Sequence, residues 1–135
     1  MNNYSEIIKK TEEFFSSQKL PDYIFIDDCG RNGDFKSEYD DMENDYTSTP
    51  AADFDYNTCA MLITDSALIN DEAMFCFLPR LIKAVFEEGA NEFLLLLRLE
   101  KIVVEDDEDL KNLLDEIKSS LKKLDGYREG LDSKK

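Results

Sequence analysis

Histidine is entirely absent from this chain of 135 residues. Histidine is the side chain most often used as a general acid or base near neutral pH, so its absence removes the central residue of most hydrolase mechanisms. The commonest metal ligand in proteins is removed with it. The sequence therefore favours a function in binding a partner over a function in converting a substrate.

Cysteine is scarce, with only three residues at positions 29, 59 and 76 and no CxxC spacing among them. An odd number without that spacing argues against both a disulfide framework and a zinc site. Cys76 lies between two phenylalanines and has no histidine to activate it, so a core position is favoured over a nucleophile. Close carboxylate pairs are expected by chance among 31 acids, and we therefore expect no enzyme activity and no cofactor.

Long hydrophobic runs are lacking as well. Apolar runs such as residues 93–97 are far too short to cross a bilayer. The first residues do not show the basic region followed by an apolar stretch that marks an export signal. We therefore expect a cytoplasmic protein that does not engage a membrane.

Positive charge is in short supply, because 16 Lys and Arg stand against 31 Asp and Glu and leave a net charge of -15. Such a balance repels nucleic acid and anionic lipid and favours encounter with a basic protein surface. The chain is nevertheless 42% hydrophobic and long enough to bury a core. We expect a single acidic globular domain over residues 1–127 and a polar tail over residues 128–135.

Apolar side chains recur at helical spacing in the first half of the chain and again after its middle. The first predicted helix begins at Ser5, a candidate N-cap, and ends by Pro21. A second begins at Asn70, which can also cap a helix, and ends at Gly89. Pro79 lies inside this second pattern, which predicts either a kink or a junction between two helices.

The last third of the chain is predicted to be helical too. Leucine-rich residues 93–97 favour a buried helix, whereas residues 102–104 favour a strand. Residues 110–124 show helical spacing, and the acids of residues 105–109 precede them at the positive end of the helix dipole. Gly126 is expected to end this helix. The fold class predicted from these patterns is a compact, mainly α single domain.

Between these helical parts, residues 23–26 are rich in β-prone side chains and predict a small β element. Residues 27–57 follow, with ten acidic side chains and only two basic ones. We expect this segment to be a long acidic loop. Residues 28–34 resemble a calcium-binding loop in part, but positions three and twelve hold Gly30 and Tyr39, so a solvated turn is favoured and no metal is expected.

Aromatic rings interleave with the acids of this segment. In a protein interface, rings supply desolvated contact area and carboxylates supply steering and pairing with Arg or Lys. The alternative is that the rings pin a long loop onto the core. The predicted partner-binding residues are Asp40, Asp41, Glu43, Asp45, Tyr46, Asp53, Asp55 and Tyr56.

Residues 70–82, with the sequence NDEAMFCFLPRLI, together with the acidic, histidine-free and α-rich character of the chain, resemble bacterial immunity proteins. Those proteins accompany polymorphic or contact-dependent growth inhibition toxins. The resemblance implies a cytosolic antidote that binds a cognate toxin domain, often a basic nuclease, and blocks its active site or substrate path. It assigns no role to individual residues.

A second hypothesis comes from the same charge balance. Carboxylates spaced like phosphates would let the chain act as an acidic nucleic-acid mimic, or as a regulatory adaptor, on a DNA-binding protein. A mimic should compete on several DNA-binding proteins, whereas an immunity protein should bind one toxin and ignore its relatives. Neither hypothesis includes direct binding of nucleic acid.

Overall fold

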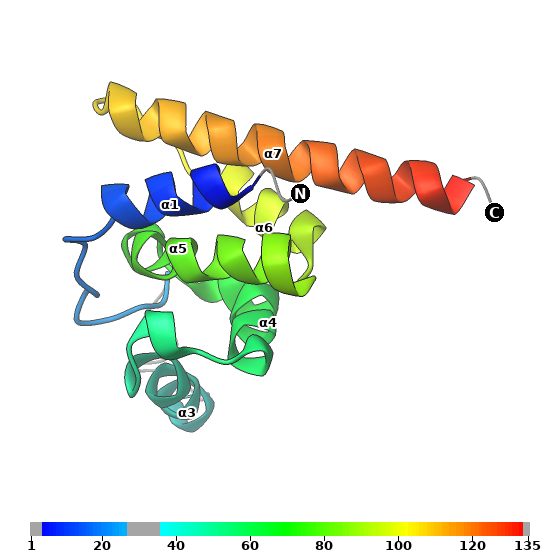
Figure 1. Cartoon of the computed structure of the whole chain (residues 1–135). Helices are drawn as coiled ribbons and strands as arrows, with labels where there is room; N and C mark the ends of the chain where they lie inside the picture. Colours follow the sequence, from blue (N-terminus) through cyan, green and yellow to red (C-terminus); the bar gives the residue numbers. More distant parts are fainter. Residues whose placement is uncertain (1–3, 27–35, 134–135) are drawn as a thin grey trace.

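The computed structural model describes residues 4–26 and 36–133, and helix α5 (Asp71–Glu88) lies at the centre of the fold (Figure 1). Asn70 caps its start, because the side-chain oxygen accepts a hydrogen bond from the Ala73 N–H at 2.8 Å. Gly89 ends it with φ of 83°, a left-handed conformation that favours glycine. Both predicted ends are confirmed. The helix is continuous across Pro79, so the alternative of two helices meeting there is wrong.

The other helices surround α5 (Figure 1). Helix α1 packs on one side of α5 and helix α4 on another, while α6 and α7 pack against each other. Helix α3 packs on α4 at the end of the molecule away from α7. The elements run α1 (Ser5–Phe14), α3 (Lys36–Thr47), η1 (Ala51–Asp53), α4 (Tyr56–Asp65), η2 (Ser66–Leu68), α5, α6 (Glu92–Glu100) and α7 (Glu108–Ser133), where η marks a 3₁₀ helix. The described residues therefore form one mainly α-helical domain with six α-helices, as the predicted fold class requires.

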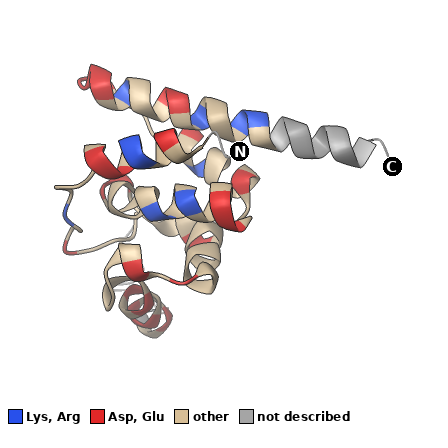
Figure 2. Ribbon diagram, in the orientation of Figure 1, with Lys and Arg blue, Asp and Glu red and all other residues tan. Residues whose placement is uncertain are grey.

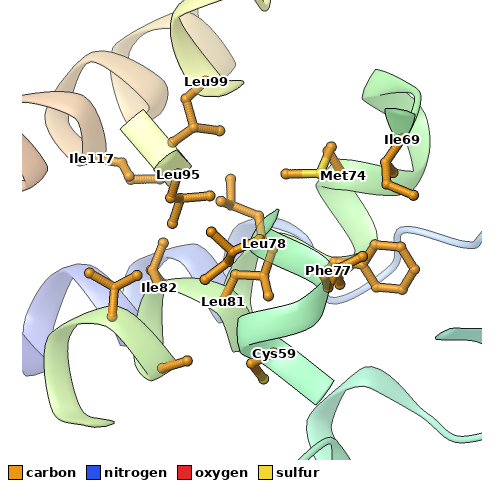
Figure 3. Close-up of a cluster of buried hydrophobic side chains, with 14 of the residues drawn as sticks. Cys59, Ile69, Met74, Phe77, Leu78, Leu81, Ile82, Leu95, Leu99 and Ile117 are labelled. Carbon is orange, nitrogen blue, oxygen red and sulfur yellow. The ribbon is translucent and has the colours of Figure 1, made fainter. Parts of the chain in front are cut away.

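Apolar side chains from α4, α5, α6 and α7 form a single core (Figure 3). Leu78, Leu81 and Ile82 of α5 are fully buried, and Leu95 of α6 and Ile117 of α7 join them. Each fully buried side chain of this size contributes about 1.5–3 kcal/mol to folding. The hydrophobic effect therefore fixes the positions of α4, α6 and α7 around α5.

Two predicted helix ends differ from the structure. Helix α1 ends at Phe14, well before Pro21, and Tyr4 stands at its N-cap position where Ser5 was expected. Phe15 follows directly and stacks on Phe75, with ring centroids 5.4 Å apart, so packing on α5 turns the chain away from the helix. Helix α7 continues through Gly126 to Ser133, and most of the expected tail is therefore helical.

Residues 23–26 do not form a strand. Phe25 makes one isolated antiparallel bridge to Ile69, with hydrogen bonds from Ile26 N–H to Leu68 O at 2.9 Å and from Asn70 N–H to Ile24 O at 2.7 Å. The ladder cannot lengthen, because η2 precedes this bridge and α5 follows it at once. The small β element predicted for residues 23–26 is therefore limited to this single bridge. Residues 102–104 are irregular, so the strand prediction for them is wrong.

Arg98 of α6 is a buried arginine that joins three elements. Its Nε donates to Ser66 O at 2.8 Å, and its Nη2 donates to Ile69 O at 2.8 Å and to Asp71 Oδ1 at 2.6 Å. A buried charge is costly unless it is paired and hydrogen-bonded, and these contacts satisfy it. Arg98 therefore ties α6 to η2, to the bridge residue and to the first turn of α5.

Candidate acidic interface

Helix α3 (Lys36–Thr47) occupies more than half of residues 36–57, the described part of the segment that the acidic composition predicted to be a loop. Tyr39, Met42 and Tyr46 recur at three- and four-residue spacing and face the core. Tyr39 packs edge-on against Phe25, with ring centroids 4.8 Å apart. The sequence did not predict this helix, because three apolar residues among five acids are too few to show a clear helical pattern. The acidic side chains are therefore displayed on an ordered surface.

Acidic residues make up much of α3 (Figure 2). Glu38, Asp40, Asp41 and Asp45 are all exposed. No lysine or arginine occurs in residues 37–79. Within the part of the chain that the structure describes, no ion pair involves Glu38, Asp41 or Asp45. We call this set of four exposed carboxylates the α3 acidic face.

Helix stability does not account for the α3 acidic face. Only Glu38 lies in the first turn, where the helix dipole favours a negative charge, and no basic residue lies in the last turn. Asp45 lies near the C-terminal end, where a carboxylate opposes the dipole. Asp41 and Asp45 are four residues apart on the same side, and such like-charged pairs destabilise a helix by about 0.2–0.5 kcal/mol. Asp41 and Asp45 therefore destabilise the helix that holds them.

Tyr46 was predicted to anchor a partner, but the structure buries it completely. Its ring lies edge-on to Phe77 at a centroid distance of 6.5 Å, and its hydroxyl donates to Asp65 Oδ2 at 2.7 Å. Burial, together with this hydrogen bond, raises the pKa of the phenol above its usual value. Tyr46 therefore packs α3 against α4 and α5. This ring follows the alternative interpretation, in which the aromatic side chains attach the acidic segment to the core.

Glu43 is half-buried beside these packing residues. One of its carboxylate oxygens, Oε2, is buried and has no hydrogen-bond partner within the described part of the chain. An unpaired buried oxygen is costly, because it has lost its water without gaining a donor. Glu43 therefore lies at the edge between the inner and outer sides of α3, and it is less accessible than the four carboxylates of the α3 acidic face.

A second group of predicted residues follows at η1 and the start of α4. Asp53 is exposed, and Tyr56 has 42% of its surface exposed. Asp55 caps α4, because its Oδ1 accepts a hydrogen bond from the Thr58 N–H at 2.8 Å. That bond lowers the pKa of the Asp55 carboxyl. Phe54 lies between Asp53 and Asp55 in the sequence, and its ring is buried against Phe77. The Asp55 side chain is exposed, so it is both a helix cap and a surface charge.

Arg80 of α5 holds this second group in place, a role that sequence reasoning missed. Its Nε and Nη2 donate to Phe54 O at 3.0 and 2.9 Å, and its Nη1 and Nη2 donate to the Glu88 carboxylate at 2.7 and 3.0 Å. The hydrogen bond from Arg80 lowers the pKa of Glu88. Because Phe54 lies between Asp53 and Asp55, this arginine positions both acids. The sequence did contain a signal for this role, because Arg80 is the first basic residue after a long acidic stretch.

Two neighbouring cavities open between the end of α1, residues 47–52 and α5. They measure about 380 and 360 Å³ and share Gln18, Ala51 and Cys76 in their walls. Desolvation, with a smaller effect from Glu72, raises the pKa of the Cys76 thiol to about 11. The thiol is therefore protonated at neutral pH and is a poor nucleophile.

Other kinds of site receive no support from the described residues. No group of three or more Cys, Asp or Glu side chains is arranged to hold a metal ion in that part of the chain. The partial calcium-loop pattern of residues 28–34 lies outside the described residues. None of the described helices combines the length and the apolar character needed to cross a membrane.

Comparison of the chain with protein-family models, with curated proteins and with solved structures found no match. The functional argument therefore depends on the geometry and charge of the chain itself. The most specific arrangement in the described structure is helix α3. It packs on the core through one side, its other side is acidic, and Asp41 and Asp45 on that side destabilise it.

Proposed function

We propose that this protein is a stoichiometric inhibitor of the immunity-protein kind, which acts in the cytoplasm by covering a basic surface on a cognate toxin domain. The observation that supports the proposal is the α3 acidic face. Its carboxylates are ordered and exposed, and Asp41 and Asp45 are unfavourable for the helix, which is expected when a surface serves binding and not folding. The mechanism is occlusion of an active site or substrate path, and it needs neither turnover nor a cofactor.

The expected complex has two parts. The α3 acidic face steers a cationic partner and pairs with its Arg or Lys side chains. Asp53 and Tyr56 extend the contact beyond α3, with a partly exposed ring beside a carboxylate. The long-range attraction of a net charge of -15 for a basic nuclease raises the association rate above the neutral value of about 10⁵–10⁶ M⁻¹s⁻¹.

The test is co-expression with the product of the adjacent upstream reading frame, followed by co-purification and kinetic titration across a salt series. We expect a one-to-one complex that protects the host and that weakens as salt rises. The double variant Asp41→Lys with Asp45→Lys should lower the association rate by at least about tenfold. The matched control is Glu105→Lys with Asp106→Lys, which changes the net charge by the same amount at another exposed acidic segment.

Equal effects of the two double variants would show that net charge alone, and not the α3 acidic face, governs binding. Absence of both complex and protection contradicts the immunity function. Competition with DNA on several unrelated DNA-binding proteins supports the nucleic-acid mimic in its place.

A further inference from the structure

The two cavities between the end of α1, residues 47–52 and α5 form one continuous recess in the surface. They measure about 380 and 360 Å³, within the range of about 300–1,000 Å³ that ligand sites usually occupy. Gln18, Ala51 and Cys76 stand in the walls of both, so the cavities adjoin. We call them together the η1 groove, because Ala51 and Ala52 of η1 line it.

The smaller cavity of the η1 groove has no charged side chain in its walls. Leu20 contributes a large apolar side chain that is 39% exposed. Phe15 and Pro79 add apolar surface in the larger cavity. The other lining side chains of the smaller cavity are Pro50, Ala51, Cys76, Phe77, Gln18 and the hydroxyl residues 47–49. The groove therefore offers an apolar group a recess within a highly charged surface.

The charges around the η1 groove differ from side to side. Exposed acids stand on both sides of residues 47–52 in the sequence, with Asp45 before them and Asp53 directly after. On the side of α1 and α5 lie two exposed cations, Lys19 between two lining residues and Lys83 in the wall itself. The remaining charges in the walls are Glu12 and Arg80, which is paired with Glu88. The acidic border of the groove is therefore the one toward α3 and η1.

The η1 groove also continues the surface proposed to bind the toxin domain. Thr47 lines the groove and lies seven residues after Asp40, so both are on the same side of α3, two turns apart. Asp53, the next predicted contact residue, follows Ala52 in η1. Because residues 47–52 join these parts and form one wall of the groove, a partner that contacts both acids lies over it.

We infer that the η1 groove is the anchor site of the inhibitor complex and receives an apolar side chain from a basic segment of the toxin domain. The inference rests on the proposed function. Tight interfaces place a few desolvated anchors in recesses and surround them with charged groups. Lys19 and Lys83 repel cations, so the basic residues of that segment flank the anchor on the side of α3 and η1.

The anchor and the carboxylates have different kinetic effects. Exposed carboxylates mainly raise the association rate, whereas a desolvated anchor mainly slows dissociation. Ala52→Trp fills the groove and leaves every carboxylate in place. We expect it to raise the dissociation rate of the complex at least about tenfold and to change the association rate less than about twofold.

The matched control is Ala67→Trp. Ala52 and Ala67 are exposed alanines in the middle of the 3₁₀ helices η1 and η2, and each lines a cavity. Binding kinetics of both variants are measured with the product of the adjacent upstream reading frame, as for the wild-type chain. Ala67→Trp should leave both rates unchanged, because its cavity lies between η2 and α6, away from the η1 groove.

Cys76 gives a second readout that needs no substitution. Its partly exposed side chain stands in the walls of both cavities, so a bound anchor should protect it from alkylation by iodoacetamide. The reaction is run at alkaline pH, because the pKa of this thiol is raised to about 11, and peptide mass spectrometry locates the label. Cys59 is fully buried and should stay unlabelled with or without the partner.

The inference is overturned, while the proposed function stands, if the complex forms but Cys76 is alkylated as fast in it as in the free chain. Equal effects of Ala52→Trp and Ala67→Trp on dissociation, or no effect of Ala52→Trp, also overturn it. Absence of any complex with the wild-type chain contradicts the proposed function, and the anchor site with it. Should thermal unfolding show that Ala52→Trp does not fold, protection of Cys76 in the wild-type chain decides the question.

Discussion

Helix α3 carries five acidic residues, and residues 105–109, just before and at the start of helix α7, are five more, yet the two sets have opposite relations to their helices. The acids of residues 105–109 gather at the positive end of α7, and Asp107 caps it by accepting a hydrogen bond from the Leu110 N–H at 3.0 Å. Each charge there is worth about 0.3–1 kcal/mol to the helix at low ionic strength. The acids of α3 run along its whole length, down to Asp45 near its negative end.

The difference separates two uses of negative charge in one small protein. Acids before α7 have a structural reason to be present, so they need no partner to explain them. Most acids of α3 have no such reason, and no basic residue follows them before Arg80. The same number of acidic residues therefore supports a functional inference in one place and none in the other. Substitutions in one set and then in the other test whether the two sets of acids differ in this way.

The largest expected effect concerns the attachment of α3 to the core. Tyr46→Ala removes a fully buried ring and its hydrogen bond to Asp65, and it should lower the free energy of unfolding by about 3–5 kcal/mol. Ile117→Ala, on the buried side of α7, should cost about 2–5 kcal/mol. Urea unfolding measures both. If Tyr46→Ala costs less than 1 kcal/mol, on the order of a surface change, α3 is not mounted on the core as described.

Tyr46 also shows which parts of the fold can be predicted from the sequence and which cannot. The ends of α5 were predictable, because Asn70 and Gly89 act through local capping that needs no knowledge of the tertiary structure. Helix α6 was predictable in type, since its run of leucines favours a helix, although within residues 93–97 Leu95 and Leu96 are buried while Phe93 and Leu97 are exposed. Helix α3 was not predictable, because its few core-facing side chains acquire their role only when Phe25 and Phe77 lie against them.

The candidate interface was predictable in part. Asp40, Asp41 and Asp45 are exposed, as an interface requires. The two positioning arginines were missed, because their acceptors are backbone carbonyls far away in sequence, Phe54 O for Arg80 and Ser66 O and Ile69 O for Arg98. A charged residue inside an apolar run such as residues 93–99 is the one signal that predicts a buried, fully bonded arginine.

Removal of the α7 cap should have the next largest effect. Asp107→Ala leaves the Leu110 N–H without its acceptor, and we expect a loss of about 0.5–2 kcal/mol in the free energy of unfolding. Asp107→Asn is the control, because asparagine caps helices as well as aspartate does. An unchanged stability in Asp107→Ala would place this acid in the same class as those of α3.

The opposite sign is expected in α3. Asp45→Asn removes a charge that opposes the helix dipole and that repels Asp41, and it should raise the free energy of unfolding by about 0.3–1 kcal/mol at low salt. The gain should shrink as salt is added, since the interactions are exposed and screened. If Asp45→Asn is destabilising at low salt, the carboxylate has a stabilising partner, and the contrast between the two helices is lost.

The smallest effect is a difference in acid sensitivity at the cap of α4. The hydrogen bond from Thr58 lowers the folded-state pKa of Asp55, so its stabilisation is complete above the unfolded-state pKa and disappears as pH falls through the folded-state value. Asp55→Asn should keep a cap at neutral pH and lose less stability on acidification. Asn70 and Asn91 already cap α5 and α6 with neutral amides.

Urea unfolding of wild type and Asp55→Asn at neutral pH and at acid pH gives the comparison, and their difference should appear only in the acid samples. An equal loss of stability on acidification in both proteins would mean that Asp55 contributes no charge-dependent capping. Asp55 would then resemble the displayed carboxylates of α3 and not Asp107 of α7. The position of each acid along its helix would no longer be enough to separate structural carboxylates from binding ones.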